Sequence, residues 1–189
     1  MSKEQLESVK TVAHELVADV VASMVQQHGH GSVAKLRPPS SWSGCPHSAT
    51  LLRIVEELSS KHEIVFESIV RKLRVRVSDD GGQLHRDVDV CRRTFVGVVD
   101  ELFADGRYNW GRVVTVFAYA GWLARGCRST SDVDSWSDVV TQVAGDYIGL
   151  KLSPWVCQQG GWVGNCYLVL TYCVRRSTQP PTLSGTGHE

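Results

Sequence analysis

WGRVVTVFAYAGWLARGC, residues 110–127, is the stretch around which the rest of the chain is expected to fold. Between Arg112 and Arg125, twelve residues carry no charge, and apolar side chains would face every side of a helix drawn through them. A helix that is apolar all round must be buried. Twelve uncharged residues are too few to cross a bilayer, which needs about twenty. This stretch is therefore predicted to be the central helix of a helical bundle.

The composition favours a single domain. The chain has 189 residues, which is long enough to bury a sizeable core. Its 20 Lys and Arg residues balance 20 Asp and Glu residues, so charge gives no reason to expect a nucleic-acid partner. The six cysteines form no CxxC pair, which favours buried thiols in a reducing compartment over a disulfide framework.

Apolar residues recur at a spacing of three and four through most of the remaining chain. The first predicted helix starts from a capping box of Ser2 and Gln5 and runs from about Leu6 toward Gly29. Further helical patterns cover residues 51–73, 84–103, 136–152, 154–159 and 162–174. No convincing period-two segment or internal repeat is present. The predicted fold is therefore all-α: a single-domain bundle of about seven or eight helices around a central hydrophobic helix.

The helical domain is expected to span residues 1–176. Residues 28–47 are rich in Gly, Pro, Ser and His and predict a mobile loop. Residues 177–189 predict a disordered tail. His28 and His30 have no carboxylate or cysteine at metal-site spacing nearby, so no metal site is expected.

Motifs of catalysis are missing from the sequence. There is no HExxH, no GxSxG and no phosphate-binding loop, so neither an enzymatic activity nor a cofactor is expected. The polar residues Asn109, Gly111 and Arg112 stand at the start of the apolar central helix. This layout is typical of a groove that receives a helix of another protein.

Two motifs in the second half of the chain carry a resemblance to a known family. Residues 101–114, ELFADGRYNWGRVV, resemble the first homology region of the B-cell lymphoma 2 (Bcl-2) family of apoptosis regulators. Residues 154–162, PWVCQQGGW, resemble the second homology region. The resemblance extends from about Leu6 to Val174. It implies a bundle wrapped around a hydrophobic central helix, which agrees with the fold predicted from the periodicity.

The resemblance also implies a groove that binds the amphipathic BH3 helix of partner proteins. Arg112 would pair with the ligand's aspartate through a charge-assisted hydrogen bond, and Asn109 would hydrogen-bond beside it. Gly111 would let the two helices approach closely, because it has no Cβ. The other groove residues implied by the resemblance are Leu58, His62, Val65, Phe66, Ile69, Val98, Leu102 and Thr115.

Several of these residues also have an ordinary structural explanation. Trp110, Trp155 and Trp162 are more readily explained by core packing than by ligand contact, because Trp buries a large area. Arg112 by itself could be an ordinary arginine at a helix start. The apolar groove residues on amphipathic helices would be core residues in many helical proteins.

Members of the family either capture BH3 helices to block cell death or oligomerise and perforate the outer mitochondrial membrane. The chain's own third homology region is LLRIVEEL, residues 51–58, in which Val55 and Glu56 replace the family's small Gly and its Asp. Val55 should clash inside a partner's groove, which favours the pro-survival class. Residues 61–73 are also similar to the myeloid-cell-leukaemia-type pro-survival members. The two residues between DG and NWGR, in contrast, occur as a spacing in executioners as well.

The predicted function is a pro-survival regulator that sequesters BH3 helices of executioner-type and BH3-only proteins. A pore-forming executioner and a non-apoptotic helix-binding adaptor are the alternatives. The expected location is the cytoplasm and the mitochondrial outer membrane, with the endoplasmic reticulum as a further site. The chain ends in STQPPTLSGTGHE, without an apolar tail of about twenty residues. Either an anchor was removed from a longer protein or this member lacks one, so membrane association would be peripheral or depend on such a tail.

Overall fold

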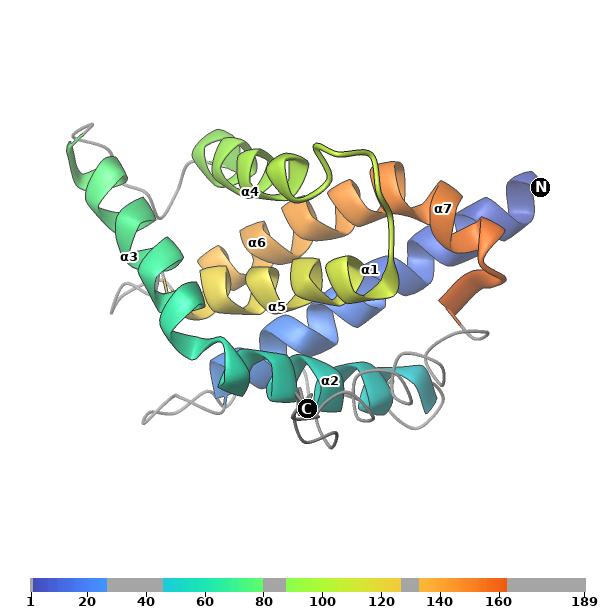
Figure 1. Ribbon diagram of the computed structural model, residues 1–189, viewed down its shortest axis with the longest axis horizontal. Coiled ribbons are helices and arrows are strands. Elements are labelled where there is room, and N and C mark those ends of the chain that lie inside the picture. Colours follow the sequence, from blue (N-terminus) through green and yellow to red (C-terminus); the bar gives the residue numbers. More distant parts are fainter. Residues whose placement is uncertain (1, 27–45, 80–87, 127–132, 163–189) are drawn as a thin grey trace, which may run out of the picture.

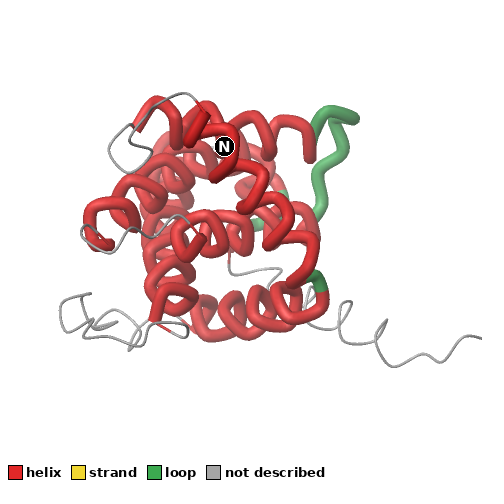
Figure 2. Tube along the Cα trace, turned by 90° about the vertical axis from the view of Figure 1, so that its left-hand side faces the viewer, coloured by secondary structure: helices red, strands yellow, loops and turns green. Residues whose placement is uncertain are grey.

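The computed structural model describes residues 2–26, 46–79, 88–126 and 133–162. These residues form seven α-helices and one π-helical turn, and they contain no strand. The elements are α1 (Lys3–Gln26), α2 (Pro46–Lys61), α3 (Glu63–Asp79), α4 (Val88–Leu102), α5 (Trp110–Gly126), α6 (Val133–Tyr147), η1 (Ile148–Leu152) and α7 (Ser153–Gln158). The perpendicular view of Figure 2 shows only helices and their connecting loops in this part of the chain. The predicted all-α class is confirmed.

Helix α5 lies at the centre of the bundle. Every residue from Val116 to Ala124 is buried, as the absence of charge in this stretch predicted. Helices α1, α2, α3 and α6 all pack against it, and Figure 1 shows it running across the middle of the molecule. The prediction of a central hydrophobic helix is confirmed.

Helix α1 covers one side of α5. It begins with the predicted capping box: the Gln5 N–H donates to Ser2 Oγ and the Ser2 N–H donates to Gln5 Oε1, both at 3.2 Å. Its apolar face, which includes Leu16 and Val20, is buried. The two helices approach so closely that a Cβ on Gly121 would lie 2.7 Å from the Cγ of Met24. A side chain at this position would therefore force α1 away from α5.

Some boundaries differ from the prediction. Helix α2 begins at Pro46, inside the last two residues of the predicted loop, and α6 begins at Val133. Helix α7 has Pro154 in its first turn, and it ends before Gly160 and Gly161, which have φ angles of +88° and +81°. Most of the predicted loop 28–47, nearly all of the predicted helix 162–174 and the tail 177–189 lie outside the described residues.

The two sequence motifs meet in a cluster of tryptophans. The ring centroid of Trp110 lies 5.2 Å from that of Trp155 and 5.9 Å from that of Trp162. Trp162 also donates its Nε1 hydrogen to the carbonyl of Val9 at 2.9 Å and packs against Phe117. The cluster holds α7 and the turn after it on α5 and α1, so these tryptophans act as packing residues.

Candidate helix-binding site

The polar cluster of the first motif forms the start of α5. Asn109 precedes the helix, and its Oδ1 accepts a hydrogen bond from the backbone N–H of Arg112 at 2.9 Å, which makes Asn109 the N-cap. Gly111 is exposed. The only described atom that an added Cβ would meet there is Asn109 Oδ1, at 3.3 Å. The space in front of Gly111 is therefore open to the backbone of another helix.

Arg112 holds a carboxylate of its own chain. Its Nη2 donates to Asp105 Oδ2 at 2.8 Å, and its Nη1 donates to Asp105 Oδ1. The same Nη1 also donates to the carbonyl of Arg107 at 2.6 Å. This is the bidentate geometry that makes Arg–carboxylate pairs strong. Both side chains still reach solvent, since 27% of Arg112 and 45% of Asp105 is exposed.

The ion pair keeps both groups charged. Hydrogen bonds from Arg112 and from the Arg107 backbone hold the pKa of the Asp105 carboxyl well below its usual value of 3.8. The same carboxylate raises the pKa of the Arg112 guanidinium. No sequence pattern assigned a role to Asp105. It lies seven positions before Arg112, and the turn between α4 and α5 brings the two together.

The turn between α4 and α5 is stabilised by a glycine, a backbone hydrogen bond and stacked aromatic rings. Gly106 has a φ of +68°, a conformation that favours glycine, and its N–H donates to the Phe103 carbonyl at 2.9 Å. Tyr108 stacks on Phe103 with ring centroids 4.9 Å apart and on Trp155 at 6.2 Å. The position of Asp105 is therefore determined by a well-packed turn.

Most of the predicted apolar groove residues lie partly exposed on the helices around α5. Val65 on α3 is the most open of them, with 54% of its surface exposed. Half-buried members are Leu58 on α2, Ile69 on α3, Val98 and Leu102 on α4, and Thr115 on α5. Helices α2, α3 and α4 each contact α5, whereas α3 and α4 do not pack closely on each other. Figure 1 shows α2, α3 and α4 arranged around α5. Leu58, Ile69, Val98 and Leu102 also pack against the buried core with part of their surface.

Two predicted groove residues are placed differently. Phe66 is buried, and its ring stacks on Trp122 with centroids 5.7 Å apart and planes 9° from parallel. It therefore anchors α3 to α5. His62 is exposed in the bend between α2 and α3, where its N–H donates to the Leu58 carbonyl at 3.0 Å. For both residues, contact with a ligand stays a prediction.

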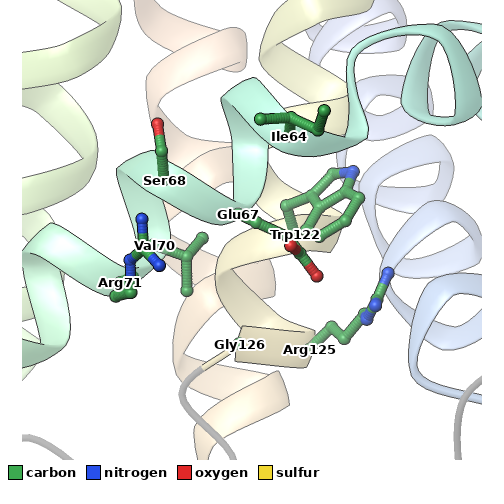
Figure 3. A pocket seen from close by; sticks show the side chains of 8 residues that line it. All are labelled: Ile64, Glu67, Ser68, Val70, Arg71, Trp122, Arg125 and Gly126. Atoms are coloured by element: carbon green, nitrogen blue, oxygen red, sulfur yellow. The ribbon is translucent and has the colours of Figure 1, made fainter.

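A cavity of about 410 Å³ opens between α3 and the end of α5 (Figure 3). It is lined by Ile64, Glu67, Ser68, Val70, Arg71, Trp122, Arg125 and Gly126. The guanidinium carbon of Arg125 lies 4.2 Å from the centroid of the Trp122 ring. On α3, the lining residues Ile64, Glu67 and Arg71 are more than about a quarter of a turn away from both Val65 and Ile69. The cavity therefore opens mainly on a different face of α3 from these two predicted groove residues.

No group of three or more His, Cys, Asp or Glu side chains in the described part of the chain is arranged to hold a metal ion. In the same ranges, no helix combines the length and the apolar character that crossing a bilayer requires.

Together, the fold and the site define a class: a helical bundle around an apolar central helix, with a polar cluster at the exposed start of that helix. Residues 51–162 match the sequence model of the apoptosis regulator proteins of the Bcl-2 family. Bcl-2-like protein 1 of Gallus gallus is 31% identical over an alignment of 185 positions, gaps included, that covers 78% of each chain. This chain belongs to the Bcl-2 family of apoptosis regulators. The family consists of regulators rather than enzymes, which confirms the prediction that the protein is not an enzyme.

Two further relatives have a shorter overlap. Bcl-2-related protein A1 of Bos taurus is 40% identical over 78 residues, which cover 40% of this chain and 44% of A1. Apoptosis regulator BAX of Mus musculus is 31% identical over 131 residues, which cover 68% of this chain and 58% of BAX. The chain thus spans about half the length of these curated relatives.

Solved structures share the fold. A zebrafish pro-survival protein, NRZ, in complex with a Bad BH3 helix has a TM-score of 0.66 at 23% identity, covering 88% of this chain and 97% of NRZ. Chicken BOK has a TM-score of 0.65 at 25% identity, covering 89% of this chain and 97% of BOK. A Trichoplax adhaerens protein, trBcl-2L2, bound to trBak BH3 has a TM-score of 0.63 at 22% identity, covering 86% of this chain and 98% of trBcl-2L2. Relatives of both kinds, pro-survival and pro-apoptotic, are among these proteins, so family membership alone does not decide the role.

Proposed function

We propose that this protein is a pro-survival member of the family that sequesters BH3 helices of pro-apoptotic partners, both executioner-type and BH3-only. The observation that carries the proposal is the start of α5, where Arg112 stands beside the open position of Gly111. The partner class is supported by the NRZ and trBcl-2L2 structures, which contain BH3 helices.

In the proposed complex, the ligand's aspartate pairs with Arg112, and its small residue packs against Gly111. Its apolar face covers the partly exposed side chains of α2, α3, α4 and α5. The full set of proposed contacts is Arg112, Asn109, Gly111, Leu58, His62, Val65, Phe66, Ile69, Val98, Leu102 and Thr115. An amphipathic helix with several well-buried anchors of this kind typically binds with a sub-micromolar Kd.

The pro-survival assignment rests on α2. Val55, at the position of the family's small glycine, is 1% exposed and lies on the buried face of α2 with Leu51 and Ile54. To donate α2 to a partner, the protein would have to expose this face. The branched Val55 side chain would then meet a groove that accepts a small residue. The similarity of residues 61–73 to the myeloid-cell-leukaemia-type members supports the same choice.

An executioner role is the second candidate. It is favoured by the identity of 31% with mouse BAX over 131 residues and by the likeness to chicken BOK.

A liposome assay distinguishes the two roles. Dye-loaded liposomes are mixed with an activated executioner such as BAX, with and without this protein. A pro-survival protein should suppress the dye release, and excess Bad BH3 peptide should restore it by occupying the groove. Dye release by this protein alone after activation would reverse the assignment. If the protein has neither effect and does not bind Bad BH3 peptide in isothermal titration, a non-apoptotic adaptor becomes the better interpretation.

We also propose that the protein acts in the cytoplasm and at the mitochondrial outer membrane, where executioners work. Fractionation of cells that express the full-length protein tests this proposal. Exclusive recovery from another compartment would contradict it.

A further inference from the structure

We propose that Asp105 is an internal competitor for the aspartate of a BH3 helix, and that it lowers the contribution of this aspartate to binding. The inference rests on the proposed function, because it concerns the arginine assigned to the ligand. Nothing in the sequence motif indicated which group holds Arg112 when no partner is bound.

The competition follows from the geometry of the guanidinium group. Both terminal nitrogens of Arg112 face Asp105, one of them at 2.8 Å, and one nitrogen also donates to the Arg107 carbonyl. An incoming carboxylate that approaches the Nη1–Nη2 edge must displace Asp105 or share these donors with it, and one that approaches the Nε–Nη2 edge shares Nη2 with Asp105. Sharing would place two like charges a few ångströms apart, which raises the free energy of the complex.

Asp105 is held in place by the turn rather than by Arg112 alone. Its Oδ1 also accepts a hydrogen bond from the backbone N–H of Arg107 at 3.0 Å, and Phe103, before the turn, stacks on Tyr108, after it. A preorganised pair loses less side-chain entropy on forming than an ordinary surface ion pair does. Asp105 is therefore a stronger competitor than a loosely held surface acid would be.

Partner selection changes as a result. In binding an aspartate-bearing helix, the protein exchanges one Arg112 ion pair for another, so the net gain is small. A helix without the aspartate leaves the Asp105–Arg112 pair intact and therefore loses little binding free energy. Asp105 thus makes the groove depend more on the partner's apolar anchors and less on its acid.

A titration with two peptides and three proteins tests this inference. The Bad BH3 peptide and its variant with the conserved aspartate replaced by alanine are titrated into wild type, Asp105→Asn and Asp138→Asn. Asn at position 105 keeps an oxygen for the Arg107 N–H but has no charge. Asp138 is exposed on α6, so Asp138→Asn is a matched control for the same chemical change. Thermal melting of each variant monitors the fold.

We expect Asp105→Asn to bind the Bad BH3 peptide about three- to tenfold more tightly than wild type, a range typical of a charged hydrogen bond that is partly open to solvent. The alanine peptide should show no such gain, and Asp138→Asn should behave as wild type. Binding by Asp105→Asn should also weaken more steeply with added salt, because a new ion pair forms without the loss of another.

Three results would overturn the inference. Equal or weaker binding by a folded Asp105→Asn variant shows that Asp105 does not compete. A similar gain for both peptides shows a general effect of charge. If Asp105→Asn melts at a lower temperature than wild type, the titration is repeated with Asp105→Ser, which also keeps an oxygen for the turn. Unchanged affinity of Asp105→Ser for the Bad BH3 peptide would likewise show that Asp105 does not compete. Failure of wild type to bind the Bad BH3 peptide at all would overturn the proposed function itself.

Discussion

The residues of the candidate site at the start of α5 depend on one another. Asn109 caps the backbone of Arg112, and the guanidinium of Arg112 reaches back to Asp105 across the turn. Gly111, between Asn109 and Arg112 in the sequence, leaves open space beside them. A partner helix that fills this opening lies next to Arg112, which is why the arginine and the glycine have to be tested as one site.

Arg112→Ala should weaken binding of the Bad BH3 peptide by about tenfold or more, because the ligand's carboxylate would be desolvated without a partner. Thermal stability should change little, since the Asp105–Arg112 pair is open to solvent. Isothermal titration and thermal melting measure the two effects separately. Arg93→Ala, on the exposed face of α4, removes the same charge and should keep wild-type affinity. Wild-type affinity of Arg112→Ala, or binding lost only through unfolding, would make Arg112 a structural arginine.

Among the helices, α3 and α4 flank the candidate site and are supported in different ways. Helix α3 is held on α5 by the Phe66–Trp122 stack and by the contact of Val70 with Gly126. Helix α4 packs mainly on α6, where Tyr147 donates to Asp100 Oδ1 at 2.7 Å. Changes at Val70, Gly126 or Tyr147, which are not among the proposed ligand contacts, should therefore alter the walls of the site without touching the ligand.

Gly126→Ala should displace α3. A Cβ on Gly126 would lie 2.1 Å from Val70 Cγ1, so the helix has to move, at a cost of about 1–3 kcal/mol in the free energy of unfolding. Gly97→Ala is the control, because, apart from the adjoining backbone of α4, its added Cβ would have no described atom within 4 Å. This control should stabilise α4 by up to about 1 kcal/mol through helix propensity. Chemical denaturation measures both changes, and a loss of equal size in both variants would contradict the close α3–α5 contact.

The Tyr147–Asp100 bond should make stability depend on alkaline pH. Burial, followed by the bond to Asp100, raises the pKa of Tyr147 above its usual value of 10.0. The folded protein thus holds this proton more tightly than the unfolded chain does. The stabilisation is complete below pH 10 and is lost as the pH rises above it. Tyr147→Phe should lower the free energy of unfolding by about 1 kcal/mol at pH 7 and should show a smaller decline above pH 10. Denaturation curves of Tyr147→Phe and of the exposed control Tyr108→Phe measure the difference; parallel declines in wild type and Tyr147→Phe would contradict it.

At the scale of the whole molecule, α2, α3 and α4, which carry the proposed apolar contacts, all contact the central helix α5. A ligand that bridges α2, α3, α4 and α5 would therefore stabilise the folded bundle against global unfolding. The stabilisation depends on ligand concentration, because only the folded state offers the complete site.

Bad BH3 peptide at a hundred times its Kd should raise the free energy of unfolding by about 2.7 kcal/mol. For a chain of this length, that corresponds to a rise in Tm of roughly 5–10 °C. Gly111→Glu should show no rise, because a bulky anion would stand where the ligand's backbone and carboxylate lie. Its own Tm should stay near that of wild type, since Gly111 is exposed and an acidic residue is favourable near a helix start. Differential scanning fluorimetry measures the Tm of both proteins with and without the peptide. An equal rise in Tm for wild type and Gly111→Glu would place the ligand elsewhere.

Features that depend on neighbours within a turn or two of helix could be predicted from the sequence. The uncharged stretch of α5 leaves no polar face, so its burial followed directly. The Ser2–Gln5 capping box and the glycines after α7 are likewise local, and both are found where the pattern placed them. Within the candidate site, the order of Asn109, Gly111 and Arg112 at the start of the central helix could be read in the same way.

Features that depend on distant residues were decided by the tertiary structure. Periodicity shows which face of a helix is apolar, but neither which helix covers that face nor how completely. Thus Val65 and Phe66 are neighbours on one predicted groove helix, yet Val65 is exposed, whereas Phe66 is buried on Trp122. Asp105 reaches Arg112 only because a packed turn reverses the chain, and this contact determines the state in which the arginine meets a partner.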